Sequence, residues 1–389
     1  MKRLSVLLLV TFIESFATIC MERGVYFLTH DVAGYSDAMN LSLALALGVA
    51  YVAGALLSHR FVRIGGEKRV VLALVFLQLL AHLAMAAVWR MPVALFASMA
   101  VVGLLNGAKW PVIESYVSAG WNARDTARAV GRFCLAWSGA VPLALLASGP
   151  LIQFWAPSLF LLPAAVNLAA LLLLWLRLPA RPPHLPEEHP DHLPSDVVRR
   201  YRGLLTASQA QLLAGYSALF ILGPLLPGVF AGLNVDTSVA TGLSGLLDGF
   251  RFAAFLLLGL WTAWHGRRDM ILLGAMAMPA GFFLALFGGS VPAVLAGEAL
   301  FGLATGCVYY AALYYAMMVH RASVGAGGSH EGIIGSGFAL GPALGLAGVA
   351  MAGLFHGNTT AGTILATTPL LVACLAVTAW KLVRTGRGR

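Results

Sequence analysis

Ionisable side chains lie inside long apolar stretches of this chain, where a charge is costly. Glu14, Asp248 and Glu331 are acids of this kind. An ionised group near the centre of a bilayer costs roughly 2.5 to 3.5 kcal/mol on insertion scales, so such groups should face one another or an aqueous cavity. Desolvation favours the protonated carboxyl, whereas an approaching cation favours the ionised form. The chemistry expected of these three acids is therefore the uptake and release of a proton.

The surroundings of the first two acids differ along the chain. Glu14 has no basic neighbour within one helical turn, so we expect it to be protonated, to bind a cation, or to reach Lys109 or Arg132 from another helix. Asp248 and Arg251 are three residues apart, which places them on one face of a helix where they can pair. That pair is either structural or part of proton coupling.

Two further charged pairs stand at the ends of apolar stretches. Glu22 and Arg23 are neighbours near the end of the first stretch, where we expect a local pair at an outer gate. His330 and Glu331 begin the eleventh stretch, where they either compensate the helix dipole or let Glu331 pair with Arg132 at an inner gate.

Charged and aromatic residues on the same stretches are candidates for lining a ligand cavity. An aromatic ring can stack on a cation, and a few placed charges orient a ligand in an otherwise apolar pocket. The same side chains are equally consistent with helix packing. The candidates are Lys109, Trp110, Arg132, Trp137, Arg251, Glu298, Tyr309 and Tyr310.

The composition is that of an integral membrane protein. Of the residues, 59% are hydrophobic and 11% are charged, too few charges to solvate a globular surface. The net charge of +9 is explained by loops that face anionic lipid headgroups, so no nucleic-acid partner is expected. No metal site or cofactor is expected either, because the four cysteines stand singly on separate stretches and the histidines of a Pro-rich segment read as a flexible loop: Cys20, Cys134, Cys307, Cys374, His184, His189 and His192.

Twelve apolar stretches are long enough to span a bilayer, which needs roughly 20 residues each. All but five of the 25 Lys and Arg residues fall before the first span, in alternate connections or in the tail. The positive-inside bias places these connections and both termini in the cytoplasm. We expect the protein in the plasma membrane. The expected spans are 5–29, 38–59, 69–89, 92–117, 128–153, 156–177, 207–231, 237–264, 269–288, 291–318, 330–354 and 360–383.

The spans divide into two halves. Residues 1–177 and 207–389 each hold six spans, and the Pro-rich, charged segment 178–206 between them is expected to be a cytoplasmic linker. Pro342 lies 200 residues after Pro142, and the same spacing separates other weakly matching positions in the two halves. Such repeats are common in secondary transporters, whose substrate sites lie between the halves near the midplane.

The connection after the second span carries the residues of a known signature. Gly54, Ser58, Arg60, Gly65 and Lys68 form a loop that resembles the signature of the major facilitator superfamily, in which a Gly and Asp-Arg precede a Gly and basic residues. Ser58 stands where the Asp is usual, and Gly65 is displaced. The resemblance covers the whole chain and implies an all-α fold of two pseudo-symmetric six-helix bundles, with spans three, six, nine and twelve at the periphery.

The eleventh span carries a second resemblance. Gly337, Gly341 and Pro342 are similar to a Gly-Pro motif that proton-driven exporters of this superfamily usually carry on their fifth span. A Gly at every fourth position also lets helices pack closely, and Pro bends a helix. Tight packing and an exporter-type hinge both remain open.

These observations predict a secondary active transporter that moves a small amphiphilic organic solute by alternating access. We expect a monomer in the bilayer that is coupled to protons and exports its solute. A proton-independent facilitator, an importer or a non-transporting membrane sensor are the alternatives. An enzyme is not expected, because the chain has no nucleophile elbow, paired-His metal helix or phosphate loop.

Overall fold

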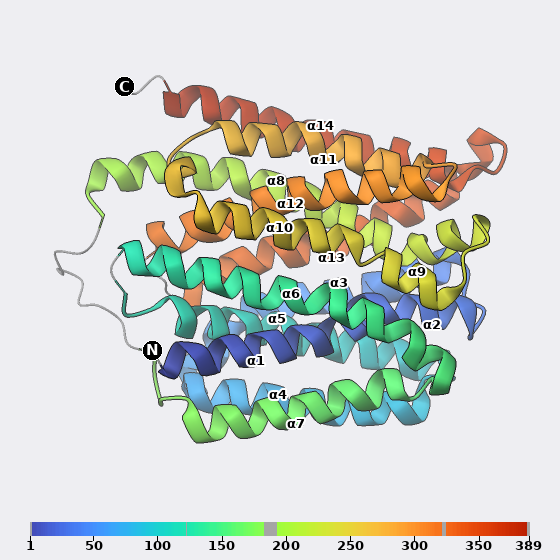
Figure 1. Cartoon of the computed structure of the whole chain (residues 1–389), viewed down its shortest axis with the longest axis horizontal. Coiled ribbons are helices and arrows are strands. Elements are labelled where there is room, and N and C mark those ends of the chain that lie inside the picture. Colours follow the sequence, from blue (N-terminus) through green and yellow to red (C-terminus); the bar gives the residue numbers. More distant parts are fainter. Residues whose placement is uncertain (1, 122, 183–192, 321–323, 387–389) are drawn as a thin grey trace.

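The computed structural model is a bundle of long helices that run side by side along one direction (Figure 1). It describes residues 2–121, 123–182, 193–320 and 324–386. Helix α1 begins and α14 ends at the same end of the bundle, which we call the terminal face; the opposite end is the far face. Twelve helical segments of the described chain are long and apolar enough to cross a membrane, which confirms the predicted number.

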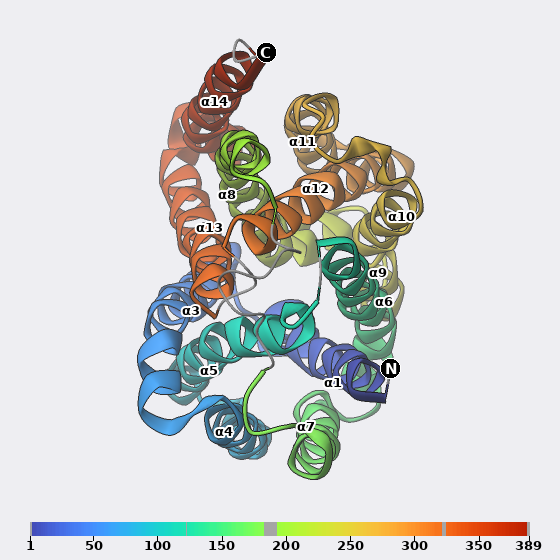
Figure 2. The ribbon, with the colours of Figure 1, turned by 90° about the vertical axis from the view of Figure 1, so that its left-hand side faces the viewer.

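The first six spans form one side of the bundle in Figure 2. The first span combines α1, a π-helical turn and α2, and each of the next five is a single helix. The elements are α1 (Lys2–Ile19), the π-helical turn Cys20–Gly24, α2 (Val25–Asp31), α3 (Asp37–Gly65), α4 (Glu67–Val88), α5 (Pro92–Ser118), α6 (Ala123–Trp155) and α7 (Ser158–Arg177).

The last six spans form the other side. The eighth span is broken into α9 and α10, and the eleventh ends in a short 3-10 helix. The elements are α8 (Ser195–Gly232), α9 (Thr237–Leu243), α10 (Leu246–Leu260), α11 (Asp269–Phe287), α12 (Val291–Val319), α13 (Val324–Ala350) with Met351–Phe355, and α14 (Thr359–Gly386).

The segment expected to be a linker is partly helical. Helix α8 begins at Ser195, so residues 195–206 extend the seventh span instead of joining the linker. The Pro-rich part and its three histidines lie outside the described residues.

The peripheral and central helices are arranged as the family resemblance implies. Helices α4, α7, α11 and α14, the third, sixth, ninth and twelfth spans, lie at the outside of the bundle (Figure 2). The two sides meet where α3 packs against α13 and α6 packs against α9 and α10. At Gly48 on α3, a Cβ atom would lie 2.7 Å from the backbone nitrogen of Ala339 on α13, so the absence of a side chain permits this approach.

Candidate functional site

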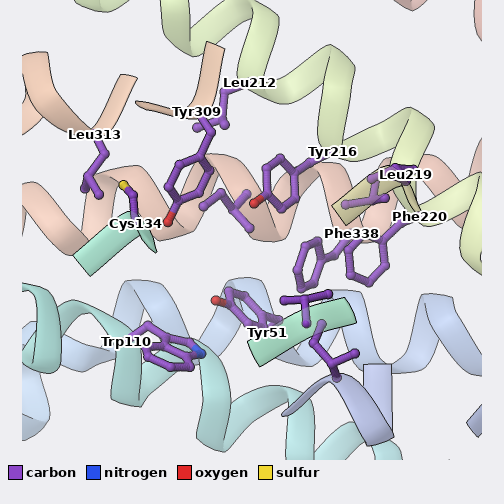
Figure 3. Close-up of a cluster of buried hydrophobic side chains, with 14 of the residues drawn as sticks. Tyr51, Trp110, Cys134, Leu212, Tyr216, Leu219, Phe220, Tyr309, Leu313 and Phe338 are labelled. Carbon is purple, nitrogen blue, oxygen red and sulfur yellow. The ribbon is translucent and has the colours of Figure 1, made fainter. Parts of the chain in front are cut away.

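A small central cavity lies between the two halves of the bundle. Its volume is about 80 Å³, and its walls come from the first span, α3, α5 and α6 on one side and from α8, α10, α12 and α13 on the other. Figure 3 shows Tyr51 and Trp110 facing Tyr216, Tyr309 and Phe338 across this region. Aromatic rings of both halves thus contribute much of the cavity wall.

The π-helical turn Cys20–Gly24 aims two charges of the first span in different directions. Glu22 and Arg23 both line the central cavity. Arg23 reaches across to Asp248 on α10, and Glu22 accepts a hydrogen bond from Asn106 Nδ2 at 3.3 Å. The expected local pair of Glu22 and Arg23 is therefore wrong, because adjacent residues on a helix do not face each other. Single π-helical turns are frequent at functional sites.

Asp248 is bound by two guanidinium groups. It pairs with Arg251 three residues away, as predicted, and also with Arg23 from the other half. Arg23 Nη2 donates a second hydrogen bond to the Ser244 carbonyl at 3.0 Å, beside the break between α9 and α10. This cluster connects the two halves toward the far face.

Other contacts connect the halves at the far face itself. Thr237 donates a hydrogen bond to Asp31 at 2.5 Å, and Gln153 donates one to Asp236 at 3.0 Å. Hydrogen bonds from Ser238 and Gln153 lower the pKa of Asp236, which lies outside the spans. The far face is therefore closed by polar contacts between the halves.

Arg251 has an aromatic neighbour as well as an acidic one. Its guanidinium lies 4.6 Å from the ring centroid of Trp137, and both residues line the cavity. Glu298, another predicted cavity residue, is fully buried near Arg23 and Asp248 and does not belong to the cavity wall. Of the candidate cavity residues, Trp110, Trp137, Arg251 and Tyr309 line the central cavity.

Glu14 and Lys109 form a buried ion pair behind the cavity. Their side chains are fully buried, and Lys109 Nζ lies 2.7 Å from a Glu14 carboxylate oxygen. One of the alternatives expected for Glu14, contact with Lys109, is therefore the one observed. Neither residue belongs to the cavity wall. Glu14 also accepts a hydrogen bond from Asn167 on the peripheral helix α7 at 2.9 Å.

The ion pair belongs to a larger polar network that sequence reasoning missed. Gln78 on α4 accepts a hydrogen bond from Lys109 at 2.8 Å and donates one to Asn106 at 2.6 Å. His82, also on α4, lies 2.7 Å from the side-chain oxygen of Asn167. The only signal in the sequence is that these amides and this histidine interrupt otherwise apolar spans.

A third polar group joins α5 to α13 in the part of the bundle nearer the terminal face. Glu114, His330 and Glu331 are buried, and their ligating atoms all lie within 4.8 Å of one another. Tyr51 donates a hydrogen bond to Glu331, which also lines the central cavity. One alternative had paired Glu331 with Arg132, but Arg132 does not reach Glu331. Arg132 is exposed and lines a different cavity.

This second cavity lies toward the terminal face between α6, α10 and α12. Its volume is about 470 Å³, and Arg132, Tyr310 and His265 contribute to its wall. The His265 ring stacks on Tyr314 at 4.3 Å, and burial lowers its pKa to about 4. Arg132 and Tyr310, which were expected in the central cavity, are therefore placed outside it.

The signature-loop residues hold the first half together. Ser58 donates a hydrogen bond to the Ala108 carbonyl at 2.9 Å, and Lys68 donates one to the Trp175 carbonyl at 3.0 Å. Gly54 packs against the backbone of α5, Gly65 ends α3, and Arg60 is exposed. These contacts are made within the first six spans.

The glycines of the eleventh span serve packing within the second half. At Gly337 a Cβ atom would lie 2.9 Å from the Ser217 backbone nitrogen, and at Gly341 it would lie 3.1 Å from the Ser217 Cα. Pro342 follows inside α13. The observed geometry is the close helix contact that small residues permit.

Comparisons with known proteins agree with this architecture. A family model described as Major Facilitator Superfamily matches residues 7–257. The chain belongs to the major facilitator superfamily. Among solved structures, it is similar to the crystal structure of the human organic anion transporter MFSD10 (TETRAN), with a TM-score of 0.67 and 12% sequence identity over 97% of this chain and 98% of that chain. No curated protein sequence matches the chain.

Membership of the major facilitator superfamily fixes the broad class of the molecule. The chain is a multi-pass membrane transporter of a small-molecule substrate, and it is a transporter rather than an enzyme. The likeness to the human structure, at 12% identity, shows the shared fold alone.

Proposed function

We propose that this chain is a proton-coupled exporter of amphiphilic organic cations. It works by alternating access as a monomer in the plasma membrane, with the terminal face in the cytoplasm. The excess of Lys and Arg in the connections at the terminal face supports this orientation. The likeness of Gly337, Gly341 and Pro342 to an exporter motif supports the direction.

The observation that carries the proposal is the setting of Glu22. Its carboxyl group lines the central cavity at the π-helical turn, and its side chain accepts one long hydrogen bond from Asn106. Among the described residues, no Lys or Arg forms an ion pair with it; the charged groups that act on it electrostatically are Lys109, Glu331 and Arg251. A carboxyl in such a site needs a proton or a cation.

The three acids predicted to couple protons are held differently. Glu14 is paired with Lys109, and Asp248 is paired with two arginines. Glu331 keeps a hydrogen bond from Tyr51 and lies beside Glu114. Glu22 is therefore the acid best placed to exchange a proton for a solute.

The cavity favours a cationic solute over an anionic one. Both guanidinium groups on its wall, those of Arg23 and Arg251, are already paired with Asp248. Tyr51, Trp110 and Phe338 line the same cavity as Glu22, and aromatic rings attract an organic cation and its apolar body. The name of the human transporter concerns organic anions, so the two solute classes provide a direct test.

Competition between the proton and the solute for Glu22 couples export to the proton gradient, which supplies the energy. The solute cation and a proton both neutralise the carboxylate, so one displaces the other. A proton that enters from outside releases the solute there, and its loss to the cytoplasm frees Glu22 for the next solute. The far-face contacts of Asp248 hold the outer side closed between these events.

Transport into proteoliposomes tests the proposal. We expect tetraphenylphosphonium to accumulate when an outward-directed proton gradient is imposed on vesicles in which the terminal face points outward, and an aromatic sulfonate anion not to accumulate. Glu22→Gln should abolish accumulation that depends on the gradient and retain exchange of solute between the two sides.

The matched control is Glu67→Gln, which removes an acid at the start of α4 that does not line the cavity. It should transport as the wild type does. Gradient-driven accumulation that survives Glu22→Gln would contradict the assignment of Glu22, and transport of the anion in place of the cation would contradict the solute class.

A further inference from the structure

We propose that Glu114, His330 and Glu331 form a binding site for a divalent transition-metal ion that locks the two halves of the transporter together. The proposal concerns a ligand other than the transported solute, and it does not depend on the coupling role of Glu22.

The geometry is that of three ligands around one ion. The nearest nitrogen of His330 and one oxygen from each carboxyl group lie within 4.8 Å of one another. Zn²⁺ binds carboxylate oxygen and imidazole nitrogen at about 2.0 to 2.2 Å, so neighbouring ligands lie about 3.4 Å apart and each side chain needs to move by about 1 Å. Two carboxylates and an imidazole suit Zn²⁺ or Mn²⁺.

The polar atoms of Glu114 and His330 have no partner outside this cluster among the described residues. Both oxygens of Glu114 and both ring nitrogens of His330 are buried, and among the described residues their only possible hydrogen-bond partner is the neighbouring Glu331 carboxyl, which Glu114 can reach through a shared proton. Buried polar groups without partners are rare and costly. A proton shared between the two carboxyl groups would satisfy Glu114 and Glu331 but would leave His330 without a partner. An ion satisfies all three.

The two carboxyl groups of the site also have no positively charged partner, so a cation would compensate their negative charge. No Lys or Arg within the described part of the chain pairs with Glu114 or Glu331. The titratable groups that face the site are Tyr51 from α3, Tyr309 from α12 and Cys134 from α6, with Glu22 across the central cavity. None of these supplies a positive charge.

The position of the ligands gives the ion a mechanical effect. Glu114 comes from α5 in the first half, and His330 and Glu331 come from α13 in the second. These helices must separate when the terminal face opens, which would pull the ligands apart. Because Glu331 also lines the central cavity, an ion can reach the site from there. The bound ion therefore selects the state closed at the terminal face and inhibits transport.

Titration of the purified, chelator-treated full-length protein with Zn²⁺ tests the site. Calorimetry should show one tight Zn²⁺ per chain, and the thermal midpoint should rise with Zn²⁺ but not with the same concentration of Mg²⁺. Since losing even an outer-shell partner weakens metal sites 10- to 100-fold, His330→Asn and Glu114→Gln should each weaken binding by about tenfold or more. Gel filtration and circular dichroism show whether each variant is folded.

A variant of the Pro-rich segment is the control. Replacing His184, His189 and His192 with Asn removes the other cluster of potential ligands in the sequence and should leave tight binding unchanged. Zn²⁺ should also slow solute exchange in the wild type and in this control, but not in His330→Asn. Binding that is lost in the control and retained in His330→Asn and Glu114→Gln would overturn the proposal, as would a protein that is stabilised by acid but does not bind Zn²⁺.

Discussion

The buried pair of Glu14 and Lys109 should behave as one structural unit. Both side chains are fully buried, and each has one other described hydrogen-bond partner, Asn167 for Glu14 and Gln78 for Lys109; the Lys109 ammonium also lies over the Trp110 ring at 4.8 Å. Lys109→Met leaves the carboxylate in the interior without its counter-charge. Removing one partner of a buried pair typically costs about 3 to 5 kcal/mol, because the remaining charge is uncompensated.

The double variant should be more stable than Lys109→Met alone. Glu14→Gln removes the uncompensated charge and keeps an amide oxygen for the hydrogen bond from Asn167. Replacing both members of a buried ion pair by neutral groups is often close to neutral in stability. The coupling free energy between the two sites should therefore exceed about 1 kcal/mol and be favourable in the double variant.

The double-mutant cycle compares the wild type, Glu14→Gln, Lys109→Met and the double variant by thermal and denaturant unfolding in detergent. Solute flux under a proton gradient is measured for the same four proteins. We expect proton-driven transport to persist in the folded double variant. Two effects that add within about 0.5 kcal/mol would show that the groups do not interact. Loss of proton coupling in a stable double variant would instead restore Glu14 as the coupling acid.

Two further predictions concern the far face and the second cavity. Asp248→Asn should weaken the contact with Arg23 and open the far face. Ser15 lines the central cavity, so a cysteine there, in a background without the native cysteines, should react faster with an impermeant maleimide; an unchanged rate would contradict the closing role of Asp248. Because burial lowers the pKa of His265 to about 4, the unfolded chain binds more protons between about pH 6.5 and 4. The free energy of unfolding should therefore decrease as the pH is lowered from about 6.5 to 4, and His265→Phe should make this decrease smaller. An equal decrease in both proteins would contradict the assignment to His265.

The number of spans and their arrangement could be predicted because the bilayer imposes them. Each span needs a long apolar run, and the peripheral position of α4 and α7 follows from the family resemblance. The beginning of α8 at Ser195 could not be predicted in the same way. Charged residues near a membrane surface are compatible with a linker or with a helix that extends beyond the bilayer, and only tertiary contacts decide between them.

The charged site was predicted in its members but only partly in its pairing. Asp248 and Arg251 were predictable because their spacing on one helix brings them together. The partners of Arg23 and Glu22 were not, because a π-helical turn changes the direction of both side chains by an amount that spacing along an α-helix does not give. Contacts between distant spans, such as that of Glu114 with Glu331, leave no pattern in a single sequence.

The exchange of a proton for a cation at Glu22 can be measured most directly as proton release upon binding. Tetraphenylphosphonium is added to the purified protein in weakly buffered detergent near neutral pH, and the protons released and the solute bound are counted together. We expect about one proton to be released per bound cation in the wild type, because both compete for one carboxyl group. Glu22→Gln should bind the cation more weakly and without proton release. Binding without release in the wild type, or equal release in the variant, would contradict the exchange at Glu22.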